Sequence, residues 1–421
     1  MNTVVKKIDP ENMTSEDFAL AAQLLREGKL VAFPTETVYG LGGDAYDKTA
    51  SARIYAAKGR PSDNPLIVHI AEISELEKLA TDIPEEAYLL AEKFWPGPMT
   101  MILNRKDTIP KETTGGLDTV AIRMPSHPIA RRLIIESGLP IAAPSANASG
   151  RPSTTKAEHV IEDLDGKIDM SIDGGSSDIG LESTIVDLTV KPALILRPGY
   201  ITLEMLKAVL PEVEYDKAVL KRVRDDTIVA KAPGMKYRHY APKGQLTIFE
   251  GDSKKVIDRI VSEVKEKLRE DARVGILAST DYVESYIKGI FGETVSRETF
   301  KSAEDGSESN GENDAGRISE IEEFRMKMSG ERREVNEASV IISGTEFGEE
   351  QDIFEIGNVV IGIVGSRDDE ATIAARLFDL LREYDTKNID YIYAECFASD
   401  NLGQAIMNRL LKAAGYHIET L

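Results

Sequence analysis

The sequence predicts an α/β protein with a larger N-terminal domain, built on a twisted open sheet, and a smaller Rossmann-like C-terminal domain. Its 421 residues exceed what one hydrophobic core usually supports. In both halves, apolar runs of strand length alternate with helical patterns, as in sheets covered by helices. Near Pro211 the pattern becomes charged and irregular. We therefore expect domains over residues 1–210 and 244–421, joined by an ordered linker at 211–243.

The N-terminal half is predicted to fold as helices between short strands. Apolar residues at helical spacing begin after Ser15 and stop at Gly28, which predicts the first helix. Further helices are expected at 47–57 and 85–94, and strands at 30–33, 66–70, 100–103, 119–123 and 140–143. The apolar runs 184–188 and 193–197 should pair as strands through the turn at Lys191 and Pro192.

A new alternation of strands and helices begins after residue 243. Strands are expected at 246–249, 274–278, 358–364 and 391–394, and helices at 256–268, 370–384 and 402–414. This order predicts a parallel sheet. Residues 302–314 contain almost no apolar side chain, so we expect a solvated acidic insertion there. Gly362 and Gly365 lack the rest of the G-x-G-x-x-G fingerprint and do not predict a dinucleotide site.

Composition limits the function classes. The net charge of −21 repels nucleic acid, so any phosphate binding must come from a local group of cations. The single cysteine, Cys396, excludes an intrachain disulfide and is compatible with a reducing compartment. We expect a cytoplasmic protein, because no signal core follows the first residues and no apolar run approaches the ~20 residues that span a bilayer. The cysteine and the scattered histidines do not have the spacing of a zinc site, and no metal ligands are predicted.

Polar side chains follow several of the predicted strands and one helix. Lys58 and Arg60 flank the end of a helix, where they would be ordinary surface charges if they stood alone. Ser145 and Asn147 follow one apolar strand, and Arg197 ends another. Because the carboxyl ends of strands in an open α/β sheet meet at one crevice, we expect these groups to form one site for an anionic ligand.

These residues belong to a longer series of motifs that resembles a known family. The motifs are 33–42 (FPTETVYGLG), 58–61 (KGRP), 65–69 (PLIVH), 95–100 (WPGPMT), 120–125 (VAIRMP), 143–147 (APSAN), 182–185 (ESTI), 197–199 (RPG), 233–235 (PGM) and 239–242 (HYAP). The sequence resembles the threonylcarbamoyl-AMP synthases of the YrdC-like family, in their long two-domain form. The resemblance covers nearly the whole chain.

The resemblance implies an activity and a set of partners. Such an enzyme condenses L-threonine, bicarbonate and ATP into threonylcarbamoyl-adenylate and pyrophosphate. Mg²⁺ would accompany the ATP phosphates and would not occupy a dedicated protein site. The product would pass to threonylcarbamoyl-transferring proteins that form threonylcarbamoyladenosine on tRNA. Weak or no binding of tRNA itself, and no membrane contact, are expected.

The resemblance also assigns roles by position. It implies that Lys58 and Arg60 are catalytic and bind phosphate. Its further nucleotide-side positions are Asn64, Thr119, Ser145, Asn147, Ser153, Arg197 and Tyr240. Its threonine-side positions are Thr37, His69, Arg123 and Ser183. Arg123 would suit the threonine carboxylate in a bidentate pair. Glu36 is not an obvious general base.

Other interpretations remain open at this point. His69 could be a core histidine, and Ser183 a turn residue. The aromatic segment 232–242 is predicted to be a lid over the nucleotide site, with a fixed seal between domains as the alternative. A module that binds double-stranded RNA is a second function class, but the net charge of −21 disfavours it. A purely structural or regulatory protein is a third, and the density of site-like residues disfavours it. The oligomeric state, the source and the role of the C-terminal domain do not follow from the sequence.

Overall fold

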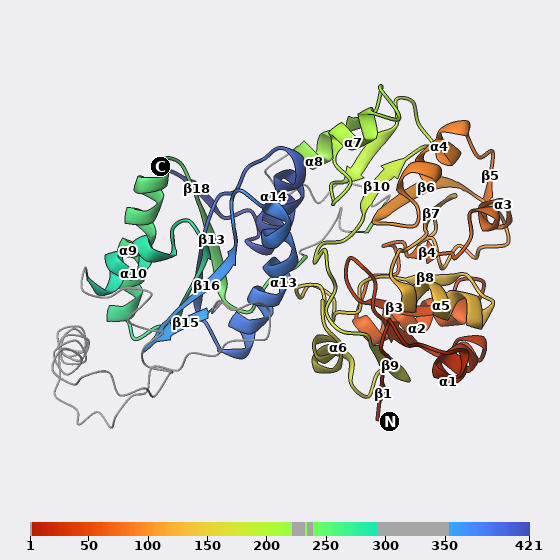
Figure 1. Ribbon diagram of the computed structural model, residues 1–421, viewed down its shortest axis with the longest axis horizontal. Coiled ribbons are helices and arrows are strands. Elements are labelled where there is room, and N and C mark those ends of the chain that lie inside the picture. Colours follow the sequence, from red (N-terminus) through yellow and green to blue (C-terminus); the bar gives the residue numbers. More distant parts are fainter. Residues whose placement is uncertain (1, 221–231, 234–238, 293–352) are drawn as a thin grey trace. The chain divides into compact units, whose positions relative to one another are not determined.

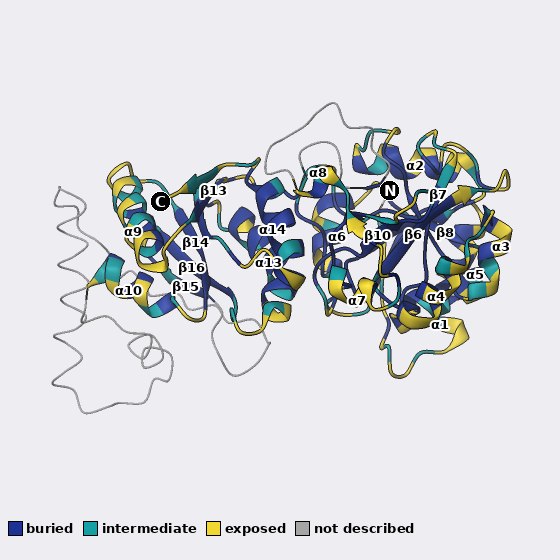
Figure 2. Cartoon of the chain, turned by 90° about the horizontal axis from the view of Figure 1, so that it is seen from above, coloured by how far each residue is buried: buried dark blue, intermediate teal, exposed yellow. Residues whose placement is uncertain are grey.

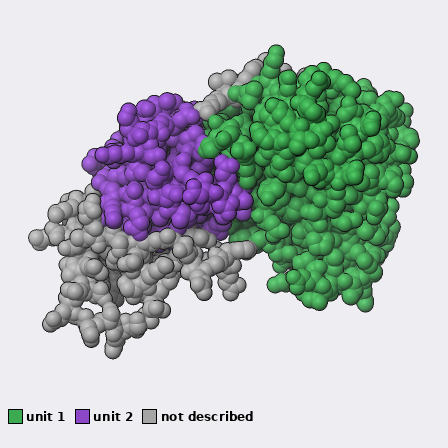
Figure 3. All heavy atoms as spheres, turned by 45° about the horizontal axis from the view of Figure 1, so that its top comes forward, with its two compact units in different colours: residues 1–241, 377–379, 398–416 green, residues 242–376, 380–397, 417–421 purple. Residues whose placement is uncertain are grey.

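The computed structural model describes residues 2–220, 232–233, 239–292 and 353–421. It divides the chain into two compact units (Figure 3). The first unit contains residues 1–241, 377–379 and 398–416, and the second contains residues 242–376, 380–397 and 417–421. Two short segments of the C-terminal half therefore belong to the same unit as the N-terminal half. The acidic segment 302–314 lies outside the described residues.

The first unit is built on a mixed sheet with the strand order β1-β9-β2-β3-β8-β4-β7-β6-β10-β11-β12 (Figure 1). Its strands are β1 (Val4–Lys7), β2 (Val31–Phe33), β3 (Gly40–Asp44), β4 (Ile67–His69), β5 (Ala80–Thr81), β6 (Met99–Arg105), β7 (Thr119–Arg123), β8 (Ile141–Ala143), β9 (Met170–Asp173), β10 (Thr184–Asp187), β11 (Leu194–Arg197) and β12 (Glu214–Tyr215). Strand β5 lies outside this order and pairs with β6.

The helices between these strands are α1 (Ser15–Arg26), α2 (Lys48–Lys58), α3 (Leu76–Leu79), α4 (Glu85–Phe94), α5 (Pro128–Ser137), α6 (Ala157–Leu164), α7 (Leu203–Lys207) and α8 (Lys217–Leu220). Helix α14 (Asn401–Ala413) also belongs to this unit, although it connects two strands of the second sheet. Helix α2 shows why the local sequence folds as it does. Asp47 caps its first turn by accepting a hydrogen bond from the Thr49 amide, and Gly59 ends it with a left-handed φ of 64°. Figure 2 shows the central strands of the unit, such as β6 and β8, in the colour of buried residues.

Most predicted elements of the first unit are present, and β10 pairs with β11 antiparallel as expected. Strand β3 was missed because three of its five residues are glycines, which are unfavourable in strand interiors. The structure shows what they allow. A Cβ on Gly42 would stand 2.8 Å from the Phe33 ring and 2.7 Å from the Ile141 side chain. Glycine is needed there so that β2 and β8 can pack closely against β3.

The second unit contains a sheet with the order β15-β16-β14-β17-β13-β18. Its strands are β13 (Gln245–Glu250), β14 (Val274–Ser279), β15 (Ile353–Ile356), β16 (Val359–Gly365), β17 (Tyr391–Glu395) and β18 (Ile418–Thr420). They run parallel except β15, which pairs antiparallel with β16. Helices α9 (Ser253–Arg269), α10 (Val283–Phe291) and α13 (Glu370–Thr386) connect them. The predicted Rossmann-like sheet is confirmed.

In the part of the chain that the structure describes, every helix is too short or too polar to cross a bilayer.

Candidate active site

One concave pocket in the first unit collects most of the residues that the sequence singled out. Eight of them line it, namely Lys58, Arg60, His69, Arg123, Ser145, Asn147, Arg197 and Tyr240. Thr35, Ser149, Glu182 and His239 line it as well. The pocket is therefore rich in cations, hydroxyls and amides, as expected for an anionic and polar ligand.

The mixed sheet explains how these residues come together, and it corrects the expected geometry. Strands β4 and β7 are parallel, with His69 opposite Arg123 at their carboxyl ends. Strand β8 runs antiparallel to β4, so its last residue, Ala143, lies opposite Ile67 and not opposite His69. The expected convergence of parallel carboxyl ends at one sheet edge is therefore wrong for this unit. The pocket lies across the strands, which allows Ser145 and Arg123 to line it together.

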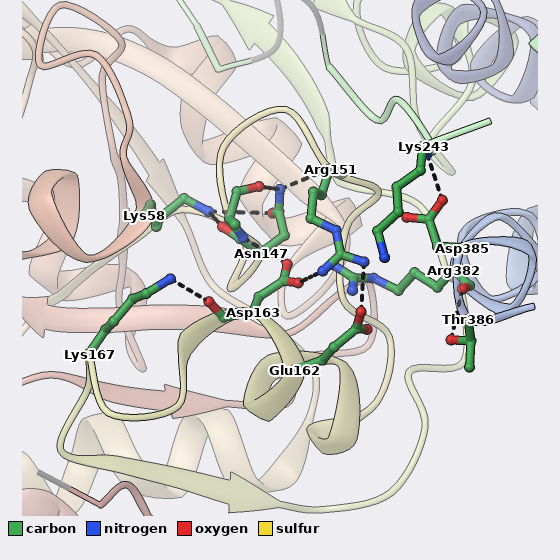
Figure 4. Close-up of polar contacts among 11 residues, drawn as sticks. Lys58, Asn147, Arg151, Glu162, Asp163, Lys167, Lys243, Arg382, Asp385 and Thr386 are labelled. Carbon is green, nitrogen blue, oxygen red and sulfur yellow. Dashed lines mark hydrogen bonds and ion pairs between the residues drawn. The ribbon is translucent and has the colours of Figure 1, made fainter. Parts of the chain in front are cut away.

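Lys58 fixes the loop that carries Ser145 and Asn147 (Figure 4). Its Nζ donates to the Ser145 carbonyl at 2.5 Å and also to the Asn147 carbonyl. The loop is held from its other side as well, because the Ala148 amide donates to Asp163 Oδ2 at 2.8 Å. Only 4% of Lys58 is exposed, so it is not the ordinary surface charge that its position at a helix end would suggest. The helix end turns the lysine inward against the loop.

Arg60 lies two residues further along and is half-buried. Its guanidinium donates to the carbonyls of Asn64, at 3.2 Å, and Pro65, at 3.1 Å. Burial lowers the pKa of Arg60 to about 10, so it remains positively charged at neutral pH. Arg60 is thus a positioned cation at the pocket wall.

A buried ion pair lies beside the pocket on the side of β7. Arg123 Nη2 is 2.7 Å from Glu36 Oε1, and both side chains are less than a tenth exposed. Burial opposes the charge on Glu36, but the nearby charge of Arg123 outweighs it and lowers the pKa of Glu36. The Nε of Arg123 has no hydrogen-bond partner among the described residues. This guanidinium therefore has donor capacity left for a ligand carboxylate.

His69 is a neutral imidazole with a defined tautomer. Burial, together with the positive charge of Arg123, lowers the pKa of His69 to about 3. Its Nδ1 lies 3.1 Å from the Ile67 carbonyl oxygen, which can only accept a hydrogen bond. The proton therefore sits on Nδ1, and Nε2 is left as an acceptor. His69 also meets the Phe33 ring edge-on at 6.1 Å.

A third group of charges borders the pocket beside β10 and β11. Arg197 donates from Nε to the Ser183 carbonyl at 3.0 Å and from Nη2 to the Ser183 hydroxyl at 3.1 Å. The neighbouring Glu182 accepts a 2.5 Å hydrogen bond from the Ser153 hydroxyl. Burial opposes ionisation of Glu182, yet the charges of Arg409 and Arg197 lower its pKa to about 2. Glu182 is thus a carboxylate at neutral pH.

Four predicted residues lie directly behind lining residues. Thr37 shares a 2.9 Å hydrogen bond with the Thr35 hydroxyl, and the Asn64 carbonyl accepts from Arg60. Ser153 contacts Glu182, and Ser183 contacts Arg197. All four are buried. These four residues therefore support the wall of the pocket from behind.

Thr119 is separated from the other predicted residues. It begins β7, whereas Arg123 ends it, so the two lie ~13 Å apart along the strand. It pairs with Asn104 and does not line the pocket.

The sequence analysis missed four lining residues named above, which are Thr35, Ser149, Glu182 and His239. Thr35, Glu182 and His239 lie in quoted motifs, and Ser149 lies just after one; each is next to or two positions from a predicted residue, and that adjacency was the available signal. Within the described parts of the chain, no three His, Cys, Asp or Glu side chains are grouped so that they could hold a metal ion.

Comparisons with known proteins agree with this arrangement. Residues 23–199 match the Sua5/YciO/YrdC family model, described as "Telomere recombination". Residues 201–415 match the model described as "Threonylcarbamoyl-AMP synthase, C-terminal domain". A threonylcarbamoyl-AMP synthase of Pyrococcus abyssi is 42% identical over 95% of this chain and 94% of its own length. One of Bacillus subtilis is 42% identical over 97% and 95%.

A solved structure is similar over the full length. The crystal structure of P. abyssi Sua5 complexed with L-threonine matches with a TM-score of 0.76 and 40% identity, and it covers 100% of both chains. Two family models in series and relatives of this identity and coverage show the family. The chain belongs to the two-domain Sua5 family of threonylcarbamoyl-AMP synthases, which are adenylyl-transferring enzymes.

Proposed function

We propose that this protein condenses L-threonine, bicarbonate and ATP into threonylcarbamoyl-adenylate and pyrophosphate. The observation that carries the proposal is the pocket itself. Lys58, Arg60, Arg123 and Arg197 converge on one cavity whose other polar groups are hydroxyls and amides. Such a cavity is suited to a substrate with a phosphate chain and a second substrate with a carboxylate.

The nucleotide is assigned to the side of the 145–151 loop. Ser145 and Asn147 are held in place by Lys58, and Arg60 presents a charged guanidinium nearby. As negative charge develops on a departing pyrophosphate, fixed cations stabilise it without reorganising. The roles of Lys58 and Arg60 at the phosphates rest on this geometry.

Threonine is assigned to the side of Arg123 and His69. A substrate carboxylate can accept from the Arg123 donors that Glu36 leaves unused. The unprotonated Nε2 of His69 can accept from an amine or a hydroxyl of the substrate. His69 and Arg123 are paired residues on the neighbouring parallel strands β4 and β7.

The reaction then balances as two steps. The free amine of threonine adds to the carbon of CO₂ derived from bicarbonate and loses a proton, which gives a carbamate. A carbamate oxygen attacks the α-phosphorus of ATP, the bond from that phosphorus to the bridging oxygen breaks, and pyrophosphate leaves with the electron pair. Little covalent chemistry is required of the protein. Its contribution is positioning, exclusion of water and stabilisation of charge.

Mg²⁺ would enter with ATP. The two carboxylates at or beside the pocket, Glu36 and Glu182, are each paired with an arginine. They are therefore poor candidates for metal ligands, and the phosphate oxygens would supply the anionic ligands of the ion.

The product would serve modification of tRNA to threonylcarbamoyladenosine through separate transferring proteins. A net charge of −21 argues against a large tRNA-binding face on this chain. A reactive mixed anhydride made here would thus be handed on and not used on bound tRNA.

Product analysis tests the proposal. The purified chain is incubated with ATP, Mg²⁺, threonine and ¹³C-bicarbonate, and the products are identified by mass spectrometry. We expect threonylcarbamoyl-AMP that carries one ¹³C atom, together with pyrophosphate. ADP and orthophosphate as the sole products would contradict it.

A further inference from the structure

A buried arginine of α14, Arg409, contacts the wall of the pocket. Arg409 is fully buried. Its Nε donates to Glu182 Oε2 at 2.8 Å, and its Nη2 donates to the Glu182 carbonyl at 3.3 Å. Helix α14 belongs to the same compact unit as the pocket, although 227 residues separate Arg409 from Glu182 (Figure 3).

Glu182 links Arg409 to the pocket. One carboxylate oxygen accepts from Arg409, and the other accepts from the Ser153 hydroxyl at 2.5 Å. With both oxygens engaged, the carboxylate cannot rotate without losing a charge-assisted hydrogen bond. Glu182 is itself a lining residue, so Arg409 fixes the orientation of one side of the pocket.

Tyr240 is also held in place by residues that include Arg409. Its φ of 64° lies in the left-handed region, which is strained for a bulky side chain and persists only where the surroundings impose it. The Tyr240 ring lies 5.1 Å from the ring of Phe378 and 5.9 Å from the Arg409 guanidinium carbon. The next amide, of Ala241, donates to the Gly150 carbonyl at 2.8 Å. The Tyr240 wall thus adjoins the loop assigned to the nucleotide.

We propose that Arg409 is a positioning residue for the nucleotide half of the reaction. It orients Glu182 and supports Tyr240, so that the wall next to the 145–151 loop is set by a helix from the C-terminal end of the chain. This proposal rests on the proposed function. It gives residues 398–416 a part in synthesis that needs no contact with substrate.

We expect substitution of Arg409 to impair the use of ATP and to leave the binding of threonine nearly unchanged. In Arg409→Ala, Glu182 loses its cationic partner and Tyr240 loses one side of its packing. We expect kcat/KM for ATP to fall at least tenfold, while KM for threonine changes less than threefold, because Arg123 and His69 lie on other strands. Arg409→Lys keeps the charge but not the two-pronged donor, and should recover part of the loss.

Removal of one partner of a buried ion pair can also destabilise the fold, so a second variant is needed. Glu182→Gln combined with Arg409→Met removes both charges of the hydrogen-bonded pair. A purely structural role predicts that this double variant regains both thermal stability and activity. A positioning role predicts that it regains stability while kcat/KM for ATP stays at least tenfold low.

Arg105→Ala is the matched control. Arg105 is a buried arginine of the same unit, with 8% of its side chain exposed, and it donates to the Ile109 carbonyl at 2.6 Å, outside the pocket. It should change thermal stability without a selective change in kcat/KM for ATP.

Calorimetric titration with α,β-methylene-ATP and with threonine, together with steady-state kinetics, decides the question. Selective loss of analogue affinity in Arg409→Lys and in the double variant supports the proposal. Unchanged analogue affinity and kcat/KM in the double variant, or an equal loss for ATP and threonine, overturns it. If the wild-type chain makes no threonylcarbamoyl-AMP, the proposed function fails instead, which separates the two results.

Discussion

Lys58 and Arg60 stand two residues apart, yet their environments predict different outcomes when each is replaced by alanine. Lys58 is buried and its ammonium group is bonded to carbonyls of the 145–151 loop. Arg60 is half-buried and is bonded only to carbonyls within its own turn. We expect Lys58→Ala to lower both stability and turnover, whereas Arg60→Ala should lower turnover with a much smaller effect on stability.

The magnitudes follow from the contacts. A hydrogen bond from a charged donor contributes about 1.5–3 kcal/mol, so the two carbonyl contacts of Lys58 correspond to about 3–6 kcal/mol of unfolding free energy. A domain is stable by about 5–15 kcal/mol, and the variant should therefore remain folded but melt at a lower temperature. For the half-buried Arg60 we expect about 1 kcal/mol. Turnover should fall more than tenfold in both, equivalent to about 1.4 kcal/mol or more of transition-state stabilisation.

Thermal and urea unfolding, measured beside the rate of pyrophosphate release, separate these outcomes. Lys48→Ala is the matched control, because Lys48 is the exposed first residue of the same helix, and it should behave like the wild type. Near-normal turnover in both site variants would show that neither Lys58 nor Arg60 stabilises the transition state. A Lys58→Ala variant as stable as the wild type would refute the argument from its buried contacts.

Three further predictions use other groups. The imidazole of His69 should stay neutral and protonated at Nδ1 from pH 8 down to pH 5, because its pKa is lowered to about 3. The measurement is the ¹⁵N NMR shifts of the ring, and shifts of a charged ring at pH 5 would contradict the prediction. Burial and the charges of Arg409 and Arg197 lower the pKa of Lys412 from 10.5 to about 7. Between pH 7 and pH 10.5 the native state therefore binds fewer protons than the unfolded state, and the free energy of unfolding should rise with pH. Lys412→Met should lose this rise in melting temperature, and an unchanged dependence of melting temperature on pH would refute the prediction. The last prediction concerns the proposed lid at residues 232–242, of which 234–238 lie outside the described residues. If this segment is a lid, it should become more resistant to proteolysis when ATP and threonine are present. No such protection, together with full activity of Tyr240→Ala, would favour a fixed seal.

Local signals were sufficient for the parts of the site that lie close together in sequence. The capping residue Asp47 and the stop at Gly59 defined α2 and therefore placed Lys58 and Arg60 at its end. The motif that contains Ser145 and Asn147 followed a buried strand, and the structure brings both into the pocket. Helix ends and strand ends are set by nearest neighbours, which is why sequence patterns locate them well.

Other parts depended on pairing, which the pattern of one strand cannot reveal. An apolar run predicts a strand but not the direction of its partner, so the sequence did not reveal that β8 runs antiparallel to β4. Thr119 was placed with the nucleotide residues, yet the length of β7 separates it from Arg123. The contact between Arg409 and Glu182 spans 227 residues, and no local signal in α14 marks the arginine as anything but a charged helix residue.

The dependence of pyrophosphate release on each substrate tests the central claim most directly. A coupled assay records pyrophosphate from the wild-type chain with ATP and Mg²⁺ while threonine and bicarbonate are omitted in turn. We predict that pyrophosphate forms only when all three substrates are present, in a ratio of one per threonylcarbamoyl-AMP. Pyrophosphate release from ATP that continues at the same rate without threonine or without bicarbonate would contradict the account.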